Sequence, residues 1–137
     1  MRLLLLLFLL PDVMAVSGDY SLEEVSVFVD MDKKAEQFFV NLTCLEGRVD
    51  YFEFAMQEQV HSTSEKGTKL RHEMLPNACR IYFENPISRG ESYAFNIDFG
   101  IEARYLEENT LYYRSISFPK DVKKFSFAVK LPENVFP

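Results

Sequence analysis

Several features that commonly reveal a protein's activity are missing from this chain of 137 residues. It contains no Gly-x-Ser-x-Gly turn and no recognisable cofactor motif. After residue 10, no apolar run approaches the roughly 20 residues that a membrane-spanning helix needs. Five glycines and six prolines are too few for a fibrous or low-complexity chain. The sequence therefore predicts a fold and a compartment, but it indicates no catalytic chemistry and no cofactor.

Net charge and aromatic content further narrow the possible classes of partner and of fold. The net charge of −6 gives a surface that repels phosphate backbones and anionic lipid, so nucleic acid is excluded as a favoured partner. The 13 phenylalanines and seven tyrosines favour pleated, half-buried surfaces, and no long amphipathic helix pattern competes with them. We expect a β-rich domain.

The first 18 residues are typical of a secretory signal peptide. Arg2 precedes the apolar run Leu3–Leu10, and small residues follow at Ala15 and Gly18, either of which suits cleavage. The alternative is a buried N-terminal helix or strand. No cysteine follows the run to carry a lipid anchor. Export places a single domain, residues 19–137, outside the cytoplasm.

Two-residue alternation between apolar and polar side chains recurs along the domain. It is clearest where Tyr93, Phe95, Ile97, Phe99 and Ile101 occupy every second position, as in a strand with one apolar face. Similar patterns predict strands over 25–29, 36–45, 49–56, 68–75, 79–84, 111–118 and 125–131. Residues 61–67 are polar throughout and predict an exposed loop, and Asn85-Pro86 predicts the end of a strand. The expected fold is an all-β, antiparallel, immunoglobulin-like β-sandwich of seven to nine strands, with a closed barrel as second choice.

Cys44 and Cys79 can form one disulfide in an exported protein. The alternative is two buried free thiols. Asn41-Leu-Thr43 is an N-glycosylation sequon, and the alternation places Asn41 on the outer face of its strand. The alternative is an unmodified polar residue there.

Metal sites are poorly supported. His61 and His72 lie in the most polar part of the chain without the spacing of a helical zinc motif, so we expect surface histidines. Asp30, Asp32 and Glu36 lack the glycine and the oxygen register of a calcium loop. We predict no metal ligand and no catalytic residue.

Aromatic side chains on the polar register of their strands are the candidate contact surface. These are Phe28, Phe39, Tyr82 and Tyr112. Large aromatics left on a wet face often mark a partner-binding site, although cross-strand packing can also cover them.

Three segments resemble parts of extracytoplasmic β-sandwich domains from prokaryotic, especially archaeal, membrane-associated proteins. They are Gly90-Glu-Ser-Tyr93, Phe118 to Val122 and Phe125 to Glu133. The resemblance implies a non-catalytic module outside the membrane, commonly preceding an anchor that is not in this chain. We expect a protein or envelope polymer as partner. The alternatives are a small-ligand carrier with a closed β-barrel, which the missing tryptophan of the lipocalin entrance motif disfavours, and an unrecognised hydrolase.

Overall fold

The computed structural model describes residues 18–55, 61–100 and 118–131. Within these ranges the chain forms strands and no helix, and no helix there is long and apolar enough to span a membrane. The strands are β1 (Asp19–Asp30), β2 (Ala35–Glu46), β3 (Arg48–Phe54), β4 (His61–Ser64), β5 (His72–Leu75), β6 (Ala78–Ser88), β7 (Ser92–Gly100) and β8 (Val122–Lys130).

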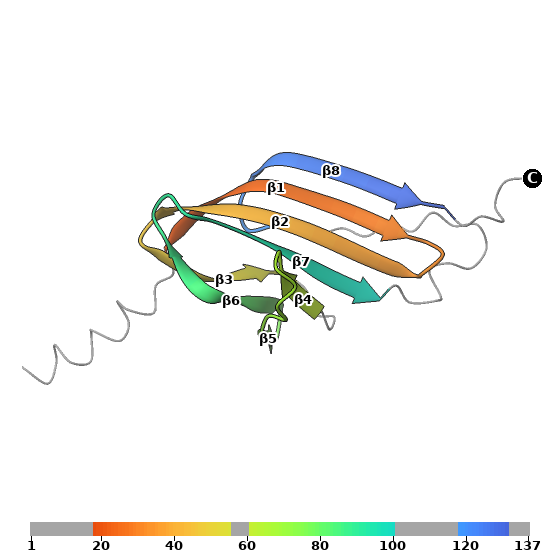
Figure 1. The fold of residues 1–137 in the computed structure, drawn as a ribbon, viewed down its shortest axis with the longest axis horizontal. Helices are drawn as coiled ribbons and strands as arrows, with labels where there is room; N and C mark the ends of the chain where they lie inside the picture. The colour runs from red at the N-terminus through yellow and green to blue at the C-terminus, as the bar shows by residue number, and fades with distance from the viewer. Residues whose placement is uncertain (1–17, 56–60, 101–117, 132–137) are drawn as a thin grey trace, which may run out of the picture.

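The strands build two layers. One sheet has the order β4-β7-β2-β1-β8, and the other has the order β3-β6-β5. Figure 1 shows the larger sheet lying across the smaller one. The prediction of an all-β sandwich with seven to nine strands is confirmed by the eight strands that the structure describes. The described strands form two separate open sheets, which does not support the closed barrel.

All strand pairs are antiparallel, as predicted, except one. β8 runs parallel to β1, with Val25 opposite Phe125 and Val29 opposite Val129. A parallel pair needs a long connection, and more than 90 residues separate the end of β1 from the start of β8. The last strand in the sequence, β8, therefore lies beside the first, β1.

The core lies between the sheets and uses the predicted faces. Phe95, Ile97 and Phe99 of β7 are buried, as alternation predicts, and β2 is the middle strand of the larger sheet. Phe52 of the smaller sheet is completely buried, with its ring centre 5.6 Å from the ring centre of Phe95 across the two layers. Interlocked rings of this kind contribute beyond their buried area.

Two local predictions were wrong. His61–Ser64 forms edge strand β4, because its backbone pairs with β7 in spite of its polar side chains. β6 continues through Asn85-Pro86 to Ser88, because a bulge accommodates the proline. Val49 pairs with Ile87 and Tyr51 with Tyr82, so the four intervening residues of β6 lie opposite a single residue of β3. The predicted 111–118 strand lies outside the described residues, apart from Phe118.

Gly18 belongs to the folded unit, one residue before the predicted start of the domain. Its N–H donates to the Arg48 carbonyl at 2.8 Å. A Cβ at this position would lie 2.4 Å from the Glu46 carbonyl oxygen and 2.6 Å from the Arg48 nitrogen. The β2–β3 turn therefore accepts only glycine here without moving.

Candidate functional site

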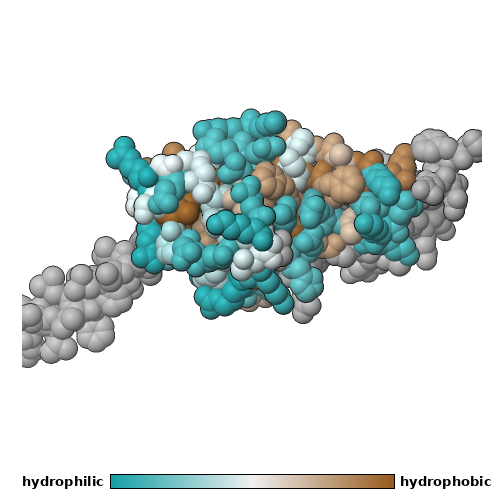
Figure 2. Space-filling model, viewed as in Figure 1, coloured by the Kyte–Doolittle hydropathy of each residue, from teal (hydrophilic) through white to brown (hydrophobic). Residues whose placement is uncertain are grey.

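β8 and the residue that follows it carry a row of apolar side chains that the second sheet does not cover. We call it the β8 apolar row: Phe125 (56% exposed), Phe127 (58%), Val129 (36%) and Leu131 (41%). Phe125, Phe127 and Val129 stand in register with Val25, Val27 and Val29 of β1, which are buried. The predicted shared face is therefore correct, but the face is exposed at this edge strand. Part of the brown surface in Figure 2 lies on the half of the molecule where β1 and β8 end in Figure 1.

Ion pairs fix β8 against β1. Lysines of the β8 region meet acids of the β1 region at Lys120–Asp19 (2.6 Å), Lys123–Glu23 (3.2 Å), Lys124–Glu24 (3.8 Å) and Lys130–Asp32 (3.6 Å). The Lys120 hydrogen bond holds the pKa of Asp19 below its ordinary value, and hydrogen bonds from Ser21 and then Lys123 lower the pKa of Glu23. Exposed pairs contribute little energy singly. Together they specify one register and neutralise the lysines of β8.

β8 ends the larger sheet. Among the strands that the structure describes, β1 alone pairs with it. The backbone N–H and C=O groups on its other edge therefore have no strand partner within those residues, and such an edge can accept a further strand. The apolar row and the open edge lie on the same element.

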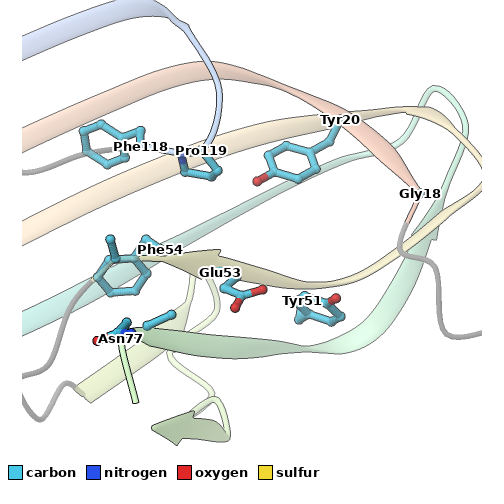
Figure 3. A pocket seen from close by; sticks show the side chains of 10 residues that line it. Gly18, Tyr20, Tyr51, Glu53, Phe54, Asn77, Phe118 and Pro119 are labelled. Atoms are coloured by element: carbon cyan, nitrogen blue, oxygen red, sulfur yellow. The ribbon is translucent and has the colours of Figure 1, made fainter. Parts of the chain in front are cut away.

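A second feature is a cleft of about 350 Å³ where the edges of the two sheets meet. Figure 3 shows Tyr20 of β1 and Phe118 just before β8 on one side, and Glu53 and Phe54 of β3 on the other. The other lining residues are Gly18, Tyr51, Ala55, Asn77, Ala78 and Pro119. The cleft thus has four aromatic rings and one charged side chain, the carboxylate of Glu53.

The cleft favours positive charge. Burial, and then the nearby Glu53 carboxylate, raise the pKa of Tyr20 to about 12. The Lys120 ammonium lies 5.5 Å from the centre of the Tyr20 ring while it pairs with Asp19. Glu53 lies 3.5 Å from an Arg80 guanidinium nitrogen and stays partly exposed.

Tyr82, one of the predicted contact aromatics, belongs to a stack on the outer face of the smaller sheet. Its ring centre is 5.8 Å from that of Tyr51. Arg71 lies 4.2 Å over the Tyr82 ring, and Arg80 lies 4.3 Å over the Tyr51 ring. The Tyr82 hydroxyl donates to Glu73 at 3.0 Å. Neighbours therefore cover much of this aromatic surface.

The other predicted contact residues lie elsewhere. Phe28 is exposed and Phe39 is half-buried on the outer face of the larger sheet, where Phe39 pairs with Ser26. That face is on the opposite side of the sandwich from Tyr82. Tyr112 lies outside the described residues. The structure therefore does not gather the predicted aromatics into one surface, and sequence reasoning missed both the exposure of β8 and the cleft.

Cys44 and Cys79 are buried free thiols, which is the second of the two predicted alternatives. The Cys44 thiol donates to the Gly47 carbonyl at 3.6 Å, whereas Cys79 pairs with Phe54. They therefore sit near opposite ends of β3, whose seven residues span about 20 Å, too far for a disulfide. Burial raises the pKa of the Cys79 thiol to about 11.

Asn41 occupies the outer face of β2, as alternation predicts. It is half-buried between Glu24 of β1 and Ala94 of β7, and its side-chain oxygen has no hydrogen-bond partner among the described residues. Glycan attachment at this sequon stays a prediction.

The two histidines that were considered as metal ligands are not brought together. His61 lies in the larger sheet and His72 in the smaller. Asp30 accepts the backbone N–H groups of Asp32 (3.0 Å) and Lys33 (3.1 Å), so it organises its own turn. No group of three metal-ligating side chains occurs among the residues that the structure describes.

Comparison with known proteins assigns no family. No family model and no curated protein matches the chain. Among solved structures, it is similar to a two-domain M1 zinc metallopeptidase bound to L-tryptophan (TM-score 0.46, 9% identity, 62% of this chain and 22% of that one). It is also similar to the M1 zinc metallopeptidase from Deinococcus radiodurans (TM-score 0.44, 10% identity, 61% of this chain and 21% of that one). The chain thus spans about a fifth of these proteins, and likenesses this distant carry nothing about activity.

Proposed function

We propose that this protein is a non-catalytic binding module that acts outside the cytoplasm as part of an envelope- or membrane-associated assembly. The observation that carries the proposal is the β8 apolar row, in which Phe125 and Phe127 are more than half exposed. Contiguous apolar side chains on an otherwise charged surface are typical of partner-binding sites.

The arrangement suits a protein partner that adds a strand. Within the described residues, β8 offers backbone hydrogen-bonding groups along its outer edge, and the row beside that edge can bury alternate side chains of an extended segment. The lysines of β8 are already paired with acids of β1 and of the turn that follows it, so recognition depends on apolar contact rather than on net charge. A partner segment with apolar residues at every second position fits this surface.

The proposed location outside the cytoplasm is supported by the N-terminal leader sequence. The run Leu3–Leu10 behind Arg2 favours export, and the acidic domain suits an aqueous compartment. Intact-mass analysis of the protein from its native host tests this directly. Loss of the leader supports export, and a full-length intracellular product contradicts it.

Site-specific photo-crosslinking tests the binding surface. A benzoylphenylalanine at Phe127 in the host cell should give one discrete adduct, and Phe125→Asp should abolish it. The matched control places the same group at Phe28, an exposed phenylalanine on the outer face of the larger sheet. Identical adducts from both positions, or an adduct that survives Phe125→Asp, would contradict recognition through β8.

A further inference from the structure

The cleft between the two sheet edges has a composition suited to one kind of ligand. Its walls carry the rings of Tyr20, Tyr51, Phe54 and Phe118. Aromatic rings present a negative face, so they attract cations as well as apolar groups. These four rings come from three separate segments of the chain, and the fold holds them around one space.

The charged side chain in the cleft is negative, so it also attracts cations. Glu53 supplies the one charged side chain among the ten lining residues. Its carboxylate also faces Arg80 at 3.5 Å, but it remains exposed enough to accept a second donor from the cleft side. Figure 3 shows the Tyr20 hydroxyl and the Glu53 carboxylate on facing sides of the same space.

The molecule already places one ammonium group at this position. Lys120 reaches within 5.5 Å of the Tyr20 ring centre from the rim of the cleft, where Asp19 neutralises it. The interaction shows that the Tyr20 ring is accessible to a cation. It also means that Lys120 competes with any ligand for that ring.

We propose that this cleft binds an organic cation, namely an ammonium or guanidinium group carried on a short apolar stem. The cationic head lies between Glu53 and the Tyr20 ring, and the stem contacts Phe54 and Phe118. This site is distinct from the β8 apolar row, so it neither requires partner binding there nor fails with it.

The probe is pentylammonium, titrated into the ¹⁵N-labelled protein and followed by backbone amide shifts. A ligand of six heavy atoms is expected to bind with a roughly millimolar Kd. Saturable shifts should cluster at Tyr20, Glu53 and Phe118. Pentanol has the same stem without the charge and should bind about 5-fold or more weakly. Equal binding of pentanol, or no saturable binding, would overturn the proposal.

Variants separate the cationic site from a merely apolar slot. Glu53→Gln and Tyr20→Leu should each weaken pentylammonium binding by about 5- to 10-fold. Lys120→Met should strengthen it about 2-fold, because it removes the competing ammonium and leaves Asp19 unpaired. The matched control is Glu73→Gln, an acid on the same sheet outside the cleft, which should change nothing. Amide spectra confirm folding of each variant, and unchanged affinity in a folded Glu53→Gln protein would refute the assignment.

Discussion

Two phenylalanine truncations test whether the β8 apolar row is exposed in the isolated protein. Phe52 is fully buried, and its ring centre lies 5.6 Å from those of both Phe54 and Phe95. Phe52→Ala should therefore lower the free energy of unfolding by about 3–5 kcal/mol, since it removes apolar contacts and leaves a cavity. Phe127 is 58% exposed. Since full burial of a phenylalanine is worth about 1.5–3 kcal/mol, Phe127→Ala should cost only about 1 kcal/mol.

Urea denaturation followed by circular dichroism measures both costs, with linear extrapolation to water. A difference of at least about 2 kcal/mol between the variants is the expected result. Phe127→Ala should also keep the wild-type circular dichroism spectrum. Equal destabilisation by the two substitutions would show that Phe127 is packed in the isolated protein, and the reasoning behind the proposed surface would be wrong.

Three further predictions concern other parts of the fold. Gly18→Ala should lower the free energy of unfolding by about 1–3 kcal/mol, because the new Cβ meets backbone atoms; a neutral effect in urea denaturation would contradict that packing. Cys79, with a pKa of about 11, should resist iodoacetamide at pH 8 until the protein unfolds, and rapid native labelling measured by mass spectrometry would oppose its burial. Asp19 and Glu23 have lowered pKa values, so they stabilise the fold above their ordinary pKa values of 3.8 and 4.5, and that stability is lost as pH falls through the folded values. Urea midpoints between pH 6 and pH 2 should consequently fall further in the wild type than in an Asp19→Asn, Glu23→Gln variant; parallel curves would argue against the pairs.

Alternation was a reliable guide to which side chains share a face. It placed Phe38, Val40 and Leu42 together, and all three are buried. It also placed Phe125, Phe127 and Val129 together, but they lie at an edge that the smaller sheet does not reach. Periodicity is a property of one strand, whereas burial depends on which element lies opposite.

Long-range pairing explains the elements that sequence reasoning missed. The residues of β4 are polar, and pairing with β7 makes them a strand. The cleft joins Tyr20, Phe54 and Phe118 from three distant segments, so no local motif announces it. One signal was available: the acid pair at 23 and 24 and the lysine pair at 123 and 124 each directly precede an alternating strand pattern. That match could have predicted the β1–β8 pair.

The parallel pairing of β1 with β8 also sets the order in which the domain can mature. Residue 22 finds its neighbour only at residue 122, so the larger sheet stays incomplete until nearly the whole described chain has emerged. At about 5–20 residues per second, the nascent polypeptide spends roughly 5–20 s with one flank of β1 unprotected. A product that terminates early keeps that flank permanently, which makes premature fragments prone to aggregation and visible to proteases.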